Sequence, residues 1–229
     1  MRPLFDLGPR LALCAGLVRP GRKLIDVGTD HAYLPIWLLR RRLVKSALAT
    51  DINPGPLEAA RRSGEKYGAG EALSLRLCDG LAGVAPEEGE DIVIAGMGGE
   101  LILRIVGETP WLRDGEKRLV LQPMSSVPEL QLGLRALGFA VLEEHAAVDG
   151  GKVYSAFAAR YVGEPPETGP LYPWLGKLVP GERGAERYAE KVLRELANQL
   201  QGARHSGAQA QAAELEARMA AIRDTYLPG

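Results

Sequence analysis

Residues 24–36 decide the fold, and they read Leu-Ile-Asp-Val-Gly-Thr-Asp-His-Ala-Tyr-Leu-Pro-Ile. The first part is a short apolar run of strand length, and the rest passes through a turn into a helical pattern. In doubly wound α/β proteins a ligand binds at such a junction, because the turn leaves room and the helix start offers free N–H groups. The next apolar run closes at Asp51, about twenty residues on, where such folds hold a ribose. Together these features predict a nucleotide-like cofactor site.

Strand and helix patterns alternate through residue 162. The runs expected to form strands are residues 23–27, 47–50, 73–77, 91–95, 118–122, 139–148 and 153–161, and the helical patterns are residues 31–43, 56–67, 100–106 and 127–137. The first five strands do not alternate in polarity, as expected for strands buried on both faces of a parallel sheet. Only Asp-Gly-Gly separates the last two, which predicts an antiparallel hairpin. This order predicts an α/β, Rossmann-like class I methyltransferase fold, with a seven-stranded, mostly parallel sheet that ends in an antiparallel hairpin.

The amino-acid composition changes after the last predicted strand. Residues 163–170 are rich in Pro and Gly and are predicted to link residues 1–162, the cofactor-binding domain, to residues 171–229. Two helical runs, starting at residues 185 and 208, are separated by His-Ser-Gly, so we expect a C-terminal helical hairpin that resembles a coiled coil. Such a hairpin either packs only on itself and the core or contacts a partner or RNA, and the sequence leaves both open.

Composition excludes several classes of protein. The net charge is −1 and 46% of the residues are hydrophobic, as in ordinary globular proteins. No apolar run approaches the eighteen or so residues needed to cross a bilayer, and the start lacks a secretory signal, so we expect no membrane partner. The two cysteines, Cys14 and Cys78, lie in separate apolar contexts, which favours a reducing, cytoplasmic location.

The first predicted turn favours S-adenosyl-L-methionine (SAM) over a nicotinamide cofactor. Asp26 offers an acidic group, and Gly28 and Thr29 are small enough for the backbone to come close to the amino-acid end of the cofactor. The glycine pattern needed to cradle a pyrophosphate is missing, and Asp30 would repel phosphates but suit a cationic sulfonium or an amino group. A competing interpretation makes Asp30 only the cap of the following helix.

Two more carboxylates follow predicted strands. Asp51 is expected to accept both ribose hydroxyls, with Ile52 stacked on the adenine and Asn53 beside it. Asp79, followed by Gly80, is placed to accept from the adenine N6 amino group. A helix cap is the competing interpretation of each acid alone, but three in succession at one sheet edge are hard to explain as caps and favour a binding site.

The fourth predicted strand ends in a glycine-rich turn. Gly96, Met97 and Gly98 would let a flat base come close to the backbone. Amino-group methyltransferases usually carry an Asn/Asp-Pro-Pro-aromatic turn here, which this chain lacks. A tight strand-to-helix turn is the alternative explanation for the glycines.

Five motifs in order resemble the bacterial tRNA (adenine 22, N1)-methyltransferases, the TrmK family. They are Asp-Val-Gly-Thr-Asp-His-Ala-Tyr-Leu-Pro-Ile (26–36), Thr-Asp-Ile-Asn-Pro-Gly-Pro-Leu (50–57), Cys-Asp-Gly-Leu (78–81), Ile-Ala-Gly-Met-Gly-Gly (94–99) and Leu-Gln-Pro-Met (121–124). The resemblance covers about residues 4–162 and also implies the C-terminal helical domain. It implies methyl transfer from SAM to N1 of an adenine in the D-arm region of tRNA.

The resemblance also suggests how the acceptor is handled. The neutral N1 lone pair is itself the nucleophile, so positioning matters more than proton removal. Methylation makes the base cationic, and Asp30 is the first candidate to stabilise that charge, with His31 and Tyr33 orienting or stacking the base. We expect no metal and a monomer or weak dimer. The alternatives are a SAM-dependent methyltransferase of another RNA base or a small metabolite, and a non-catalytic SAM- or RNA-binding module.

Overall fold

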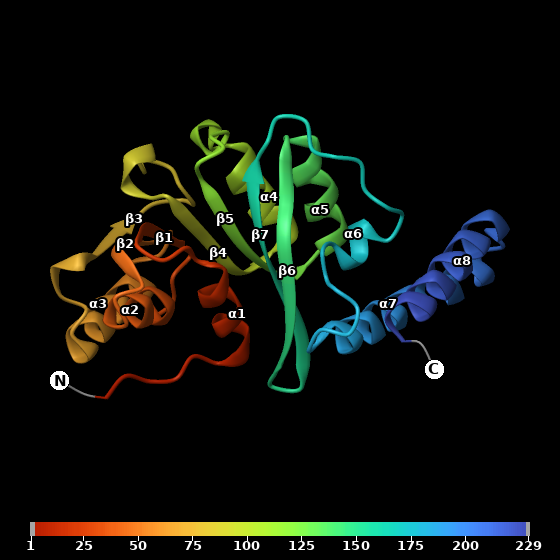
Figure 1. Ribbon diagram of the computed structural model, residues 1–229, viewed down its shortest axis with the longest axis horizontal. Helices are drawn as coiled ribbons and strands as arrows, with labels where there is room; N and C mark the ends of the chain where they lie inside the picture. The colour runs from red at the N-terminus through yellow and green to blue at the C-terminus, as the bar shows by residue number, and fades with distance from the viewer. Residues whose placement is uncertain (1–2, 228–229) are drawn as a thin grey trace.

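A seven-stranded sheet forms the centre of the molecule, as the computed structural model of residues 3–227 shows (Figure 1). The strand order is β3-β2-β1-β4-β5-β7-β6. The bounds are β1 (Arg22–Val27), β2 (Val44–Asp51), β3 (Leu73–Leu77), β4 (Asp91–Gly98), β5 (Arg118–Ser125), β6 (Phe139–Asp149) and β7 (Lys152–Tyr161). The first five strands are parallel and β7 runs antiparallel to both of its neighbours. The predicted methyltransferase-type sheet is confirmed.

Helices cover both faces of this sheet. One face carries α1 (Pro9–Leu17), α2 (Tyr33–Arg40) and α3 (Pro54–Tyr67), and the other carries α4 (Gly99–Gly107) and α5 (Val127–Ala136). Short 3-10 turns lie at η1 (Gly70–Ala72), η2 (Pro86–Glu88) and η3 (Pro110–Leu112). Along β1, Leu24 packs with the α1–α2 side and Ile25 with the α4 side, because successive strand residues point to opposite faces.

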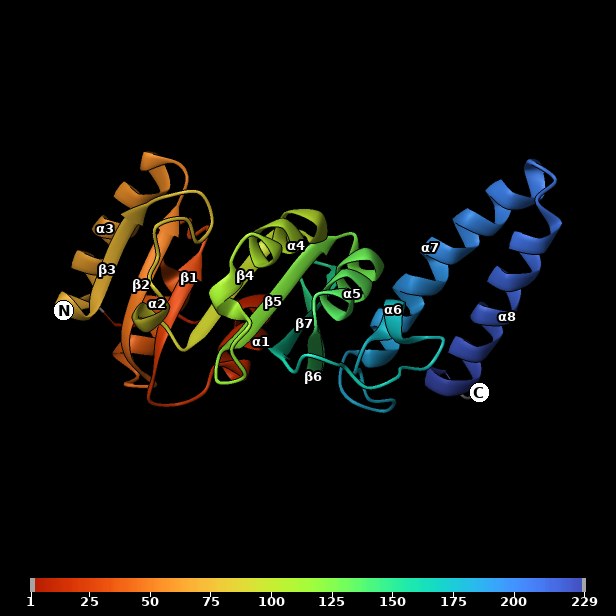
Figure 2. The same cartoon turned by 90° about the horizontal axis from the view of Figure 1, so that it is seen from above.

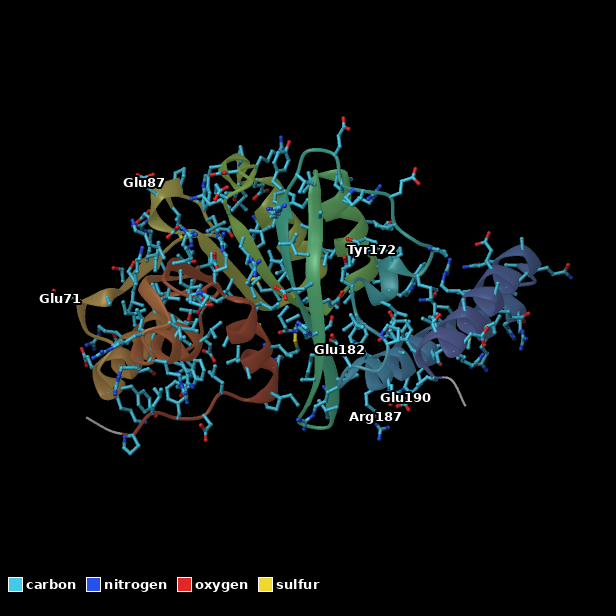
Figure 3. The ribbon with its side chains drawn as sticks, viewed as in Figure 1. Glu71, Glu87, Tyr172, Glu182, Arg187 and Glu190 are labelled. Atoms are coloured by element: carbon cyan, nitrogen blue, oxygen red, sulfur yellow. The ribbon has the colours of Figure 1, made fainter. Side chains whose placement is uncertain are left out.

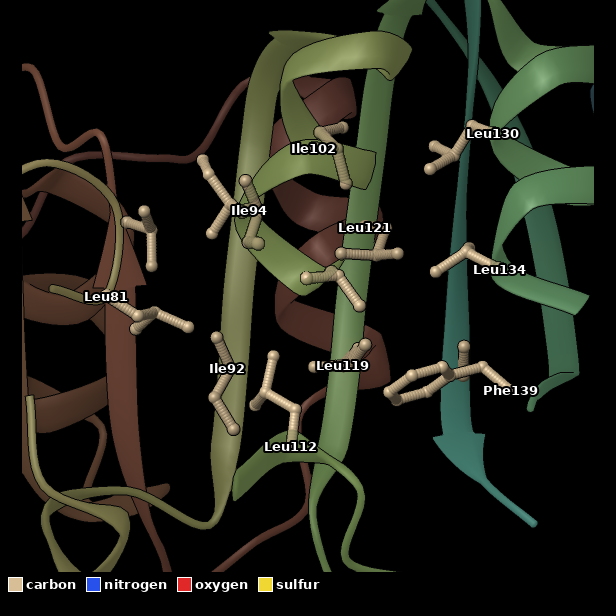
Figure 4. Packing of buried hydrophobic residues seen from close by; sticks show 14 of the residues in the cluster. Leu81, Ile92, Ile94, Ile102, Leu112, Leu119, Leu121, Leu130, Leu134 and Phe139 are labelled. Atoms are coloured by element: carbon tan, nitrogen blue, oxygen red, sulfur yellow. The ribbon is translucent and has the colours of Figure 1, made fainter. Parts of the chain in front are cut away.

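The larger core lies between the sheet and helices α4 and α5 (Figure 4). Ile94 on β4 and Leu121 on β5 pack there with Ile102 of α4 and Leu134 of α5, and all four are fully buried. Burial of each such side chain contributes about 1.5–3 kcal/mol. This packing holds β4 and β5 rigidly, so that the turns at their carboxyl ends have fixed positions.

A helical hairpin extends beyond the β6 edge of the sheet (Figure 2). It consists of α7 (Ala185–His205) and α8 (Gln209–Tyr226), and short helix α6 (Tyr172–Leu175) precedes it. The hairpin has a core of its own that also includes Ala146 of β6. The hydroxyl of Tyr226 donates to the carbonyl oxygen of Leu178 at 2.7 Å and ties the end of α8 to the loop before α7. The predicted helical hairpin is confirmed, while the division into two domains stays a prediction.

Two local features differ from the sequence-based expectation. Helix α2 begins at Tyr33 and not at residue 31, because Ala32 adopts a left-handed conformation with φ of 54°. The hydroxyl oxygen of Thr29 accepts the Ala32 N–H at 3.1 Å, so the interpretation of Asp30 as the helix cap is wrong. Helix α1 had no predicted counterpart, since its nine residues lack a capping side chain at Gly8 and a first-turn acid.

Within residues 3–227, no helix has the length and apolar character required to cross a membrane.

Candidate functional site

The carboxyl ends of β1 and β4 meet at the centre of the sheet, where the strand order reverses direction. Ligands bind in doubly wound sheets at this position. Gly28 follows β1 with φ of 71°, and Gly96 lies in β4 with φ of 78°. Side-chain-bearing residues rarely adopt this backbone region, so glycine is favoured at both turns. Between the turns is a cavity of about 190 Å³, the switch-point cavity, which Arg10, Asp26, Thr29, Asp30, His31 and Tyr33 help to line.

Asp26 places a buried carboxylate in this cavity. Its side chain is in β1 and accepts a hydrogen bond from Thr29, and burial raises its pKa to about 6. In the part of the chain that the structure describes, no basic side chain forms an ion pair with Asp26. A desolvated carboxylate without a cation is unfavourable unless a ligand supplies positive charge. The amino group of SAM fits this requirement.

The turn after β1 is held by backbone bonds to β2. The carbonyl oxygen of Thr50 accepts the N–H groups of Gly28 at 2.8 Å and Thr29 at 2.9 Å. The Thr50 hydroxyl donates to the carbonyl oxygen of Gly80 at 3.2 Å. The ends of β1, β2 and β3 are therefore fixed relative to one another, so the three predicted acidic positions lie along one edge.

Asp30, His31 and Tyr33 form the outer side of the switch-point cavity. The rings of His31 and Tyr33 are stacked with centroids 5.1 Å apart and an interplanar angle of 17°. The Asp30 carboxylate is 82% exposed and lies 3.6 Å from Nε2 of His31. The ring of Phe5 packs edge-on against the ring of Tyr33, with the two ring centroids 4.9 Å apart. An exposed acid beside stacked rings can receive a planar base and stabilise positive charge on it.

Asp51 and its neighbours lie at the end of β2. The carboxylate of Asp51 accepts the backbone N–H of Asn53 at 2.7 Å, which orients it at the start of α3. Ile52 is 60% exposed and Leu77, which pairs with Asp51 across the sheet, is 58% exposed. Two large apolar side chains are thus exposed beside a carboxylate, and the contact of Asp51, Ile52 and Asn53 with a cofactor stays a prediction.

Asp79 is engaged with a basic side chain. Its two carboxylate oxygens accept from the Arg104 guanidinium at 2.9 and 3.2 Å, and this contact lowers the pKa of Asp79. Asp79 and Gly80 line a second cavity of about 320 Å³ between β3 and α4, next to Arg104. The structure thus brings Asp26, Asp30, His31 and Tyr33 together in one cavity and places Asp79 in a neighbouring one.

The glycine-rich turn closes the inner side of the site. The Met97 side chain lies over Gly28, where a β-carbon would collide with it. The register between β4 and β5 shifts on both sides of Met97, so the strand bulges at this point. Gly98 precedes helix α4 and lies against Ser125 of β5. These residues shape the turn, and their contact with a cofactor stays a prediction.

Sequence reasoning missed Arg10, and it named Gln122 only as part of the 121–124 motif, without a role. Nη1 of Arg10 donates to Oε1 of Gln122 at 2.6 Å, and the same oxygen accepts the Gly96 N–H at 3.1 Å. Arg10 is the only charged residue of α1, which packs against the far strands of the sheet. A single arginine in an apolar segment was the available signal, but only the tertiary fold brings it to the switch-point cavity.

Among residues 3–227, no three or more His, Cys, Asp or Glu side chains are grouped so that they could hold a metal ion.

Comparison with known proteins places the chain among methyltransferases. The model of a family described as a methyltransferase domain matches residues 7–157. The tRNA (adenine(22)-N(1))-methyltransferase of Bacillus subtilis (strain 168) is 34% identical over 155 residues, which cover 68% of this chain. That match spans 65% of the B. subtilis enzyme, just under two thirds of its length.

Solved structures match over almost the whole chain. A Streptococcus pneumoniae protein, assigned as a tRNA (m1A22) methyltransferase, superposes with a TM-score of 0.83 at 30% identity, covering 96% of this chain and 99% of that one. The same protein in complex with SAM superposes with a TM-score of 0.81. The m1A22 tRNA methyltransferase TrmK of B. subtilis superposes with a TM-score of 0.71 at 26% identity, covering 97% of this chain and 99% of that one. These matches include the helical hairpin.

Proposed function

The chain belongs to the TrmK family of methyltransferases, and on this premise we propose that it transfers a methyl group from SAM to N1 of adenine 22 in tRNA. The observation that supports this most directly is the buried, unpaired carboxylate of Asp26 at the switch point of a methyltransferase-type sheet. A cationic amino-acid cofactor matches that charge, whereas a dinucleotide phosphate would not.

Residues at the strand ends would hold the cofactor. Asp26 accepts the amino group, while Gly28, Thr29, Gly96, Met97 and Gly98 provide close backbone approach. Asp51 accepts the ribose hydroxyls, with Ile52 and Asn53 beside the adenosine, and Asp79 with Gly80 lies toward the adenine. When bound, SAM supplies a methyl group on a positively charged sulfur. The protein contributes alignment, which for two held reactants lowers the barrier by several kcal/mol.

The acceptor adenine would enter from the side of Asp30, His31 and Tyr33. The stacked rings of His31 and Tyr33 hold the base flat, with its N1 lone pair directed toward the cavity. No base catalyst is needed, because N1 carries no proton before the transfer. Asp30 stabilises the positive charge that develops on the adenine ring as the methyl group arrives. The bond from N1 to carbon forms as the carbon–sulfur bond breaks.

We infer further properties from the same chemistry. The D-arm region of tRNA is the substrate region, and the base must be unstacked before it reaches the cavity. Methyl transfer to a neutral nitrogen needs no metal. The protein works in the cytoplasm as a monomer or weak dimer, and light scattering at two concentrations measures the oligomeric state.

Mass spectrometry of nucleosides from tRNA methylated in vitro tests the proposed function. Wild-type protein with SAM should produce N1-methyladenine, and a transcript with guanine at position 22 should not be methylated. Asp30→Asn should lower kcat by about tenfold to a hundredfold with little change in SAM affinity. Glu71→Gln is a matched control, because this exposed carboxylate lies in η1 before β3 (Figure 3), at the amino end of the parallel strands, whereas Asp30 follows the carboxyl end of β1. Methylation at another position, or of small metabolites only, would contradict the proposal.

A further inference from the structure

A basic groove lies between the catalytic domain and the helical hairpin. Two adjoining cavities of about 640 and 390 Å³ share Met124 and Lys191, and both exceed the switch-point cavity in volume. The end of β5, the β6–β7 hairpin and α7 enclose them. We call this the hairpin–α7 groove and define it by Met124, Lys152, Tyr154, Arg187, Lys191 and Arg194.

The larger of the two cavities carries an excess of positive charge, because four cations and one carboxylate, Glu190, line it, while the smaller cavity adds Glu129 and Glu195. Arg187, Lys191 and Arg194 recur at positions i, i+4 and i+7 of α7, so they share one face of the helix. Lys152 comes from the opposite wall, at the start of β7. Figure 3 shows Arg187 and Glu190 next to each other near the tip of the β6–β7 hairpin.

Only part of this charge is neutralised within the protein. Glu190 pairs with Arg187 at 3.1 Å, and Glu195 lies 3.9 Å from Lys191. Lys152 and Arg194 are exposed, and neither forms an ion pair with a carboxylate of residues 3–227. Two free cations that face each other across a groove suit a polyanion.

The groove adjoins the switch-point cavity. The guanidinium of Arg10 lines the switch-point cavity and also lies over the ring of Tyr154, 6.0 Å from its centroid. Tyr154 in turn lines the groove, and Met124 is two residues beyond Gln122, the partner of Arg10. A strand that leaves a base at the switch-point cavity would therefore continue directly into the groove.

We propose that the hairpin–α7 groove binds backbone phosphates of the tRNA next to the target adenine, with Lys152 and Arg194 as phosphate contacts. The inference rests on the proposed function and adds the surface that positions the substrate. Neighbouring basic residues on this face of α7 have Cβ atoms about 5–6 Å apart. Lys152 lies on the opposite wall, so a phosphate backbone in the groove would have cations on both sides. Tyr154 and Met124 add flat and apolar surface on which a flanking base can stack. The α7 helix then serves as an RNA contact and not only as a packing element.

The test measures binding of fluorescent tRNA by anisotropy over a range of salt concentrations. The double variant Lys152→Gln/Arg194→Gln should bind about tenfold more weakly at physiological salt. The magnitude of the slope of log K against log[salt] should fall by about 1.5, because two phosphate contacts are lost and each contributes about 0.7–0.9 to that magnitude. SAM affinity, measured by calorimetry, should stay unchanged. Neither substituted side chain has an ionic partner in the described protein, so no carboxylate is left unpaired.

The matched control is Lys45→Gln/Arg113→Gln. These two exposed cations carry the same total charge but lie at the amino end of the parallel strands, Lys45 as the second residue of β2 and Arg113 between η3 and β5. The control should keep at least half of the wild-type affinity and the wild-type salt slope. An equal loss in both double variants would mean unspecific attraction and would overturn the inference.

The outcomes separate this inference from the proposed function. If wild-type protein makes N1-methyladenine while the Lys152→Gln/Arg194→Gln variant binds tRNA as tightly as wild type, the groove assignment fails and the function stands. If tRNA binds but no N1-methyladenine forms, the function fails and the groove is judged by the salt slopes alone. If poly-glutamate displaces tRNA but the double substitution leaves the affinity for tRNA unchanged, the tRNA binds to cations outside the groove. That result would also overturn the assignment.

Discussion

Nη1 of Arg10 donates a hydrogen bond to Oε1 of Gln122 at 2.6 Å, and this contact joins the first helix to the carboxyl end of β5. Gln122 is fully buried, and its Nε2 donates to the carbonyl oxygen of Pro123 at 2.8 Å. The same side chain accepts the Gly96 N–H. One glutamine thus orients a guanidinium and a glycine turn that both border the switch-point cavity.

Replacing this glutamine should affect stability and cofactor binding together. Gln122→Leu removes the acceptor for Arg10 and Gly96, so we expect the free energy of unfolding to fall by about 1–3 kcal/mol. SAM affinity should fall severalfold because the turn and the guanidinium lose their orientation. Urea denaturation and calorimetry measure the two effects. Gln131→Leu, at another fully buried glutamine, should lower stability but not SAM affinity. Equal SAM affinity in wild type and Gln122→Leu would contradict the proposed role.

Asp26 should make cofactor affinity pH-dependent. Its pKa of about 6 in the free protein means that half of the molecules carry a protonated Asp26 at that pH. A cationic amino group binds the ionised form, so SAM affinity should fall as the pH decreases from 7 to 5. Asp26→Asn should bind SAM at least tenfold more weakly at pH 7.5 and lose this pH dependence. Calorimetry at pH 5–8 checks both, and an unchanged slope in the variant would refute the assignment.

Glu144 should lower stability as the pH rises. It is buried on β6, where its Oε2 accepts the backbone N–H of Lys177 at 3.0 Å and Nε2 of Gln131 at 3.3 Å. Burial raises its pKa to about 7, so between about pH 4.5 and 7 the unfolded chain releases this proton while the folded protein keeps it. The free energy of unfolding should therefore decrease over that range, by up to about 3 kcal/mol.

Glu144→Gln tests this, because it keeps the acceptor and cannot ionise. The variant should be more stable than wild type at pH 8 and equal to it near pH 4.5. Urea denaturation at several pH values gives the difference. The raised pKa of Asp26 also makes the free energy of unfolding decrease with rising pH, and it does so in both wild type and Glu144→Gln. Only the difference between the two stability curves therefore reports on Glu144. Parallel curves would show that Glu144 does not carry the effect.

Asp79 should contribute to SAM binding despite its contact with Arg104. Each carboxylate oxygen has a second lone pair, which is free to accept from an adenine amino group. Asp79→Ala should weaken SAM binding by about tenfold, which corresponds to about 1.4 kcal/mol. Glu108→Ala is the matched control, since Glu108 binds the same guanidinium at 2.9 Å but does not follow a strand. Equal effects of the two substitutions would mean that Asp79 acts only through Arg104.

Local patterns were enough to predict the sheet. All seven strands lie where β-rich runs were expected, because strands buried on both faces, such as β1 and β4, need mostly apolar residues. The expectation of burial on both faces is wrong for β3, which is at the sheet edge, alternates in polarity and has no fully buried residue. The Asp-Gly-Gly turn likewise predicted the β6–β7 hairpin. The start of α2 was missed, since the left-handed Ala32 follows from its bond to Thr29 and from burial, and not from helix propensity.

The sequence by itself determined the sheet, the helical hairpin and the acidic residues at the strand ends, because each depends on neighbours within a few positions. Only the tertiary structure decided which side chains share a cavity. Arg10 and Gln122 are 112 positions apart, and Lys152 and Arg194 come from different elements. Whether the members of each pair lie close together depends on how α1 and α7 pack against the folded sheet. Such packing reflects the burial of many apolar side chains at once, which no single stretch of sequence encodes.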